Sequence, residues 1–167
     1  SVTMIYTFRR PRHLALLSLV ASLLASMVAT LGPTGVTAPV AASPDQVAVA
    51  APPVLVLMDM STSMNEDDGT GREKVDGAKQ AAIGFVRFVS ETAPGTRVGL
   101  NSYPSGTDCG PGVTNIGISP VSSSIMDREI RAMGTRDGGT PTAQALLKAG
   151  DDIERAGGTG VILLVSD

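Results

Sequence analysis

The sequence VLVLMDMSTS (residues 54–63) joins five consecutive apolar residues to a polar segment that contains Asp59, Ser61 and Ser63. A continuous apolar run of this length is typical of a β-strand that is buried on both faces. In an extended chain, side chains at alternate positions point the same way, so we expect these three oxygen-bearing side chains to converge just beyond the strand. Carboxylate and hydroxyl oxygens suit a hard divalent cation, and we predict that the segment binds Mg²⁺ or Mn²⁺.

The remainder of residues 54–167 alternates between apolar strand patterns and amphipathic helix patterns. Beyond the first strand (54–58), the predicted elements are strands at 97–103, 113–118 and 161–165 and helices at 73–91, 124–133 and 142–156. This alternation predicts an α/β fold with right-handed crossovers and a doubly wound, mostly parallel sheet that carries helices on both faces. The strand at 113–118 is expected at a sheet edge. We expect a capping box from Ser124 to Asp127 and a cap at Thr142 to begin the last two helices.

Two later segments add oxygen ligands to the same edge of the predicted sheet. Thr140 lies in the turn GGTPT (residues 138–142), and Asp167 follows the apolar strand 161–165. Because ligands of open α/β sheets bind beyond the carboxyl ends of the strands, we expect these loops to meet the first one there. The predicted metal ligands are Asp59, Ser61, Ser63, Thr140 and Asp167.

Length and charge restrict the classes of protein that fit. The chain of 167 residues has room for one domain and a leader, and its formal net charge is −3. From Ser43 onward it carries 10 Lys and Arg against 16 Asp and Glu, a balance of 10 − 16 = −6. Basic clusters interleaved with aromatic residues are absent from the sequence, so we predict no binding to nucleic acid.

The first 42 residues have the pattern of an export leader. Arg9, Arg10 and Arg12 precede residues 14–31, which carry no charge, as in the basic and apolar regions of a signal peptide. The alternative is an uncleaved N-terminal membrane anchor, although a helix over 14–31 would reach about 27 Å, slightly less than a hydrocarbon core of roughly 30 Å. Either interpretation predicts a secreted or cell-surface protein, because positive charge stays on the cytoplasmic side. Residues 43–53 are rich in Ala, Val and Pro and are predicted to be a linker.

The order Asp59-x-Ser61-x-Ser63, then a Gly-Gly-Thr-Pro turn, then an apolar strand that ends in Ser-Asp resembles the von Willebrand factor A domain over residues 54–167. The resemblance implies the Rossmann-like fold of that family and its metal-ion-dependent adhesion site. Asp59, Ser61 and Ser63 match its first loop, Thr140 its second and Asp167 its third. Thr62 stands where many members carry Gly. The family's sheet continues with two more strands after the third loop, so the resemblance implies that these last strands are missing from the 167 residues.

The resemblance also implies a function. A metal held mainly by neutral hydroxyls keeps much of its charge, and one open coordination position would bind an acidic residue of a partner protein. We therefore predict an extracytoplasmic, non-enzymatic binding module. The alternatives are a metal-assisted hydrolase or phosphotransferase with Asp59 as nucleophile, or a structural fragment without activity. The enzyme is disfavoured because it needs an acid or base partner, whereas the only histidine is His13 and position 61 carries Ser where Asp-x-Asp phosphatases need a second acid.

Overall fold

The computed structural model describes residues 2–9, 51–106 and 109–167. The predicted leader segment 14–31 and most of the predicted linker 43–53 lie outside the described residues. The elements, in chain order, are β1 (Val2–Arg9), β2 (Val54–Asp59), the short 3₁₀ helix η1 (Thr62–Asn65), α1 (Lys74–Thr92), β3 (Arg97–Tyr103), β4 (Val113–Pro120), α2 (Ser123–Ala132), α3 (Thr142–Arg155) and β5 (Thr159–Ser166). The predicted strands and helices of residues 54–167 are all present, with bounds that agree to within two residues.

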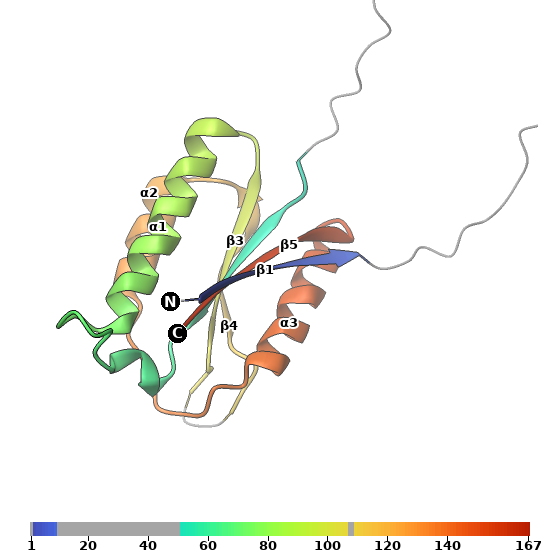
Figure 1. Ribbon diagram of the computed structural model, residues 1–167. Helices are drawn as coiled ribbons and strands as arrows, with labels where there is room; N and C mark the ends of the chain where they lie inside the picture. Colours follow the sequence, from blue (N-terminus) through green and yellow to red (C-terminus); the bar gives the residue numbers. More distant parts are fainter. Residues whose placement is uncertain (1, 10–50, 107–108) are drawn as a thin grey trace, which may run out of the picture. The chain divides into compact units, whose positions relative to one another are not determined.

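The strands form one open sheet in the order β1-β5-β2-β3-β4. The three inner strands are parallel, because β2 pairs in parallel with both β3 and β5. Helices cover both faces, with α1 and α2 on one face and α3 on the other (Figure 1). The predicted α/β fold with helices on both faces of the sheet is therefore confirmed.

The two outer strands are antiparallel to their neighbours. β4 forms an edge, as predicted, and pairs antiparallel with β3. Only residues 104–112 separate these two strands, which is too short for a crossover helix, so the chain turns back on itself. At the other edge, β1 pairs antiparallel with β5 from Val2 opposite Ser166 to Arg9 opposite Thr159. This strand was not predicted from the sequence, and it overlaps the start of the predicted leader.

β2 separates two apolar layers. Val56 and Met58 belong to the core under α1 and α2, whereas Leu55 and Leu57 belong to the core under α3. These four side chains are at most 1% exposed. Burial on both faces explains why residues 54–58 lack the polar alternation of a half-exposed strand.

Two details of the predicted helix starts are wrong. Ser122 is the N-cap of α2, so Ser124 lies inside the helix, and Asp127 accepts hydrogen bonds from Arg87 and Arg131 instead of completing a capping box. The ion pairs compete for the carboxylate that a capping box would use. Thr142 is the first helical residue of α3 and not its cap, because the N-cap position is Pro141. The Thr142 hydroxyl is hydrogen-bonded to the Tyr103 hydroxyl of β3 instead.

Among the helices of the described ranges 2–9, 51–106 and 109–167, none combines the length and the apolar character that a membrane-spanning helix needs.

Candidate metal centre

The carboxyl ends of the three parallel strands bring polar side chains to one edge of the sheet. Asp59 ends β2, Tyr103 ends β3 and Ser166 ends β5. Because β2 lies between the other two strands, the last side chains of β3 and β5 reach Asp59 from both sides. This is the position at which open α/β sheets bind ligands.

The Asp59 carboxylate is fully buried and accepts three hydrogen bonds. Its Oδ1 accepts the Ser61 backbone N–H at 2.9 Å. Its Oδ2 accepts the Ser166 hydroxyl at 2.9 Å and the Tyr103 hydroxyl at 3.3 Å. A carboxylate has about four acceptor positions, so these donors orient the group and leave capacity for one further partner. A carboxylate as buried as Asp59 (0% exposed) favours a cation as that partner.

The Tyr103 side chain links Asp59 to the beginning of α3. Its hydroxyl lies 3.2 Å from the Thr142 hydroxyl and donates to Asp59. Burial, together with the negative charge of Asp59, raises the pKa of Tyr103 to about 12. The phenol therefore stays protonated at neutral pH, and acts as a hydrogen-bond donor to the carboxylate.

The two serine hydroxyls of the first loop lie together. Ser61 Oγ is 3.1 Å from Ser63 Oγ. Two neighbouring ligands of an octahedral Mg²⁺ at 2.0–2.1 Å are separated by about 2.9 Å, so this pair matches adjacent positions of such an ion. The extended conformation predicted for this loop is nevertheless wrong at Ser63, because Ser63 lies in η1 (Thr62–Asn65). The 3₁₀ turn after Asp59, rather than strand alternation, brings the hydroxyls together.

The structure does not bring the remaining two predicted ligands into the same hydrogen-bonded group. The Thr140 side chain is exposed, and its backbone carbonyl accepts the Thr142 N–H at 2.8 Å. Asp167 Oδ2 accepts a hydrogen bond from Lys74 Nζ at 2.9 Å, and the same ammonium donates to Glu66 at 2.8 Å. The hydrogen bond from Lys74 lowers the pKa of Asp167. Asp167 directly follows Ser166 in the chain, and Thr140 lies two residues before Thr142. Ser166 and Thr142 both belong to the hydrogen-bond network of Asp59 and Tyr103.

Four residues of this site were not predicted as site residues from the sequence: Tyr103, Thr142, Ser166 and Lys74. Tyr103 and Ser166 are polar residues at the carboxyl ends of predicted strands. They therefore meet the same criterion that identified Asp59. Lys74 had no comparable signal, because its contact with Asp167 joins segments far apart in the sequence.

The donor set is dominated by hydroxyl groups. Within residues 2–9, 51–106 and 109–167, no three Asp, Glu, His or Cys side chains are arranged to hold a metal ion together. Asp59, Ser61 and Ser63 provide one carboxylate and two hydroxyls, a set that fits Mg²⁺ or Mn²⁺ and not a soft metal.

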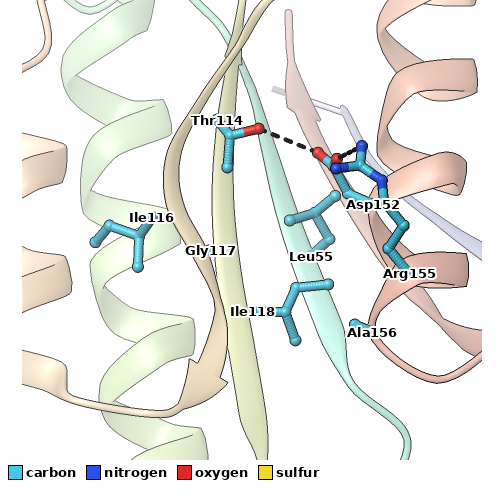
Figure 2. Close-up of a pocket in the computed structure, with 8 residues that line it drawn as sticks. All are labelled: Leu55, Thr114, Ile116, Gly117, Ile118, Asp152, Arg155 and Ala156. Atoms are coloured by element: carbon cyan, nitrogen blue, oxygen red, sulfur yellow. Dashed lines mark hydrogen bonds and ion pairs between the residues drawn. The ribbon is translucent and has the colours of Figure 1, made fainter.

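A separate cavity of about 440 Å³ lies between β4 and α3 and includes none of the five predicted ligands. Leu55 and Ile118 form part of its wall (Figure 2), and Asp152 accepts hydrogen bonds there from Thr114 and Arg155. The adjacent Lys148 donates to Asp152 at 2.8 Å.

Replacement of Lys148 by Met is expected to raise the pKa of Asp152. Burial favours the neutral acid, but hydrogen bonds from Lys148 and Asn101 outweigh it, so the pKa of Asp152 lies below its ordinary value. A lowered pKa in the folded state stabilises the fold above the unfolded-state pKa of about 3.9, and this contribution is lost as the pH falls through the lower folded value. Carboxyl ¹³C NMR titration measures the shift. Lys79→Met is the control, because the Lys79 ammonium contacts the Arg131 carbonyl and not Asp152. It should leave the Asp152 titration unchanged. A pKa that is equal in both variants would contradict the role of Lys148.

Comparison with known proteins gives one family match. The family model described as von Willebrand factor type A domain matches residues 54–167. No curated protein matches the chain at a significant level.

The chain is similar to solved structures from three bacteria. The vWF domain of the type V pili tip protein Mfa5 from Porphyromonas gingivalis is 21% identical at a TM-score of 0.51, over 67% of this chain and 36% of that chain. An uncharacterized membrane spanning protein from Vibrio fischeri is 16% identical at 0.49, over 62% and 50%. The conserved hypothetical protein BatB from Bacteroides thetaiotaomicron is 19% identical at 0.47, over 59% and 44%. The chain thus spans half or less of the length of each of these relatives.

Proposed function

Because the chain belongs to the von Willebrand factor type A domain family over residues 54–167, we propose that it is a metal-dependent protein-binding module with a metal-ion-dependent adhesion site. Domains of this family generally mediate protein–protein interactions. Asp59, Ser61 and Ser63 would hold Mg²⁺ or Mn²⁺, completed by Thr140 and Asp167. When bound, the metal would supply a positive charge with an open coordination position.

The observation that carries this proposal is the buried Asp59 carboxylate beside two serine hydroxyls. Hydrogen bonds from Ser61, Tyr103 and Ser166 hold the carboxylate in one orientation. The hydroxyls of Ser61 and Ser63 are 3.1 Å apart, a spacing that suits neighbouring positions of an octahedral ion. For Asp167 to join them, its carboxylate would exchange the Lys74 ammonium for the metal.

The partner that fits such a site is a protein with an exposed Asp or Glu. A hard cation that is held by few carboxylates keeps most of its charge, so a carboxylate from outside is its natural additional ligand. The location that we propose is outside the cytoplasm. Its support is the leader pattern of Arg9 to Arg12 before the uncharged residues 14–31, and membrane anchoring through that segment remains the alternative to cleavage. A pilus-tip protein among the solved relatives is compatible with this location.

We propose a binding module and not an enzyme because, apart from Asp167 itself, the site offers no evident general base. The only histidine, His13, lies in the leader region of the sequence. Tyr103, the titratable side chain in contact with Asp59, has a pKa of about 12 and is protonated at neutral pH. A phosphoester hydrolysis assay that gave equal background rates for the wild type and Asp59→Ala would support this assignment. Hydrolysis that Asp59→Ala abolished would contradict it.

The proposed function predicts that Mn²⁺ or Mg²⁺ stabilises the full 167-residue chain. Ligand at about 100 times its Kd adds about 2.7 kcal/mol to the free energy of unfolding, which corresponds to a rise in Tm on the order of 10 °C. Ser63→Ala should weaken Mn²⁺ binding by about tenfold or more, since one oxygen ligand is lost. Differential scanning calorimetry and Mn²⁺ electron paramagnetic resonance measure the two effects.

Ser90→Ala provides the matched control, because the Ser90 hydroxyl donates to the Arg87 carbonyl within α1. It should bind Mn²⁺ like the wild type. A Tm that is insensitive to both metals would refute metal dependence. Once Mn²⁺ is bound, N-acetyl-aspartic acid α-amide, whose only carboxylate is the side chain, should displace metal-bound water and change water proton relaxation, whereas N-acetyl-asparagine α-amide, which has no carboxylate, should not. Equal effects of the two compounds would argue against recognition of a carboxylate.

A further inference from the structure

The backbone of Arg136 is hydrogen-bonded to the first loop of the candidate metal site (residues 59–63). Arg136 lies in the segment between α2 and the Thr140 turn and is half-buried. Its N–H donates to the Met60 carbonyl at 2.7 Å. Its own carbonyl accepts the Thr62 hydroxyl at 3.4 Å. Met60 and Thr62 alternate with the predicted ligands Asp59, Ser61 and Ser63, so the backbone of Arg136 runs alongside the loop that carries these ligands.

The side chain of Arg136 reaches a third segment. One guanidinium nitrogen, Nη1, donates to the Ser102 hydroxyl at 3.0 Å and to the Pro104 carbonyl at 2.9 Å. These acceptors lie on either side of Tyr103, the residue that bonds to Asp59. Both are neutral oxygens, so the guanidinium serves here as a geometric donor. Its planar, permanently charged head makes it suited to hold two acceptors at fixed positions.

Two further hydrogen bonds connect the same three segments. The Met60 N–H donates to the Tyr103 carbonyl at 2.7 Å, which ties the first loop to the end of β3. The Thr135 hydroxyl donates to Asn65 Oδ1 at 2.8 Å, which ties the residue before Arg136 to the end of η1. Arg136 contacts both the first loop and the end of β3. It also leads, four residues later, into the predicted ligand Thr140.

We propose that Arg136 is a positioning residue that sets the distance between the Thr140 turn and the loop of Ser61 and Ser63. This inference rests on the proposed metal-dependent function. Without the guanidinium, the Ser102 and Pro104 contacts are lost, and the segment that leads to Thr140 keeps only its bonds to the first loop and to η1, which are those of the Arg136 backbone and of the Thr135 hydroxyl. The metal ligands of the first loop remain, but the second loop moves more freely with respect to them.

Arg136→Ala in the full chain tests this proposal in the absence of metal. Amide hydrogen exchange of residues 60–65 and 137–142 should accelerate by about tenfold, while the amides of β2 and β5 keep their protection. Arg136→Lys should restore part of the protection, because an ammonium can still donate to Ser102 or Pro104. Arg131→Ala is the matched control, since the Arg131 side chain bonds to Asp127 on its own helix, and its exchange at the two segments should equal that of the wild type.

A second measurement connects the positioning role to the metal. The Mn²⁺ Kd of Arg136→Ala should rise by about tenfold, with a smaller rise for Arg136→Lys and none for Arg131→Ala. Unchanged exchange at 137–142, or an acceleration spread evenly over the whole sheet, would overturn the proposal. A wild-type chain that binds no Mn²⁺ would refute the proposed function instead, while the exchange data on the metal-free variants would still decide the role of Arg136.

Discussion

Asp59→Ala is expected to abolish stabilisation by Mn²⁺ and also to lower the free energy of unfolding of the metal-free protein by about 2–4 kcal/mol. The substitution removes the carboxylate that centres the candidate site. It also leaves the Ser61 N–H, the Tyr103 hydroxyl and the Ser166 hydroxyl without their acceptor. Tyr103 and Ser61 are at most 1% exposed, so solvent cannot replace the lost bonds at low cost.

Urea unfolding with and without Mn²⁺ separates the two effects. Asp59→Asn retains one carbonyl oxygen as an acceptor but loses the charge, so it should lose the metal response with a smaller loss of stability. Asp151→Ala, at an exposed position of α3, should leave both quantities close to the wild type. A Mn²⁺ response that survives Asp59→Asn would mean that the metal binds elsewhere on the chain.

Leu100→Ala is expected to lower the free energy of unfolding by about 2–5 kcal/mol. Leu100 lies in β3, is 0% exposed and belongs to the core layer under α1 and α2. Truncation removes apolar contacts and leaves a cavity between the sheet and these helices. Loss of stability without a change in the denaturant m-value would be observed by guanidinium unfolding.

The same chemical change on the surface provides the control. Leu147 in α3 is 72% exposed, so Leu147→Ala should change the free energy of unfolding by less than about 0.5 kcal/mol. Similar losses for the two variants would contradict the assignment of Leu100 to the core. Because neither residue lies at the candidate metal site, the pair also separates general loss of stability from loss of metal binding.

Local patterns were sufficient to predict most of the fold. The apolar run at 54–58 and the apolar stripe of α1 are local patterns that indicate which faces of the strand and of the helix are buried. The structure confirms both predictions of burial. The direction of β4 was less accessible, because it depends on the length of the connection after Tyr103 as well as on the strand pattern. β1 (Val2–Arg9) contains β-branched and aromatic residues, but its partner β5 is distant in the sequence.

The candidate site was predictable only in part for the same reason. Asp59 and Ser61 follow directly from the end of a buried strand, whereas the position of Ser63 depends on the 3₁₀ turn. The contact of Asp167 with Lys74 and the contacts of Arg136 join segments that no short pattern relates. These interactions depend on how the loops pack against one another, which short sequence patterns do not specify.

The position of β2 between two apolar layers has a consequence for the kinds of mutation that the domain tolerates. Alternate residues of β2 face opposite helices, and the strand ends at the buried Asp59. A deletion of one residue within 54–58 would either send Val56 and Met58 toward α3 or withdraw Asp59 from the edge of the sheet. Substitutions that keep an aliphatic side chain avoid both outcomes. This stretch of the gene should therefore accept changes of residue type far more readily than insertions or deletions.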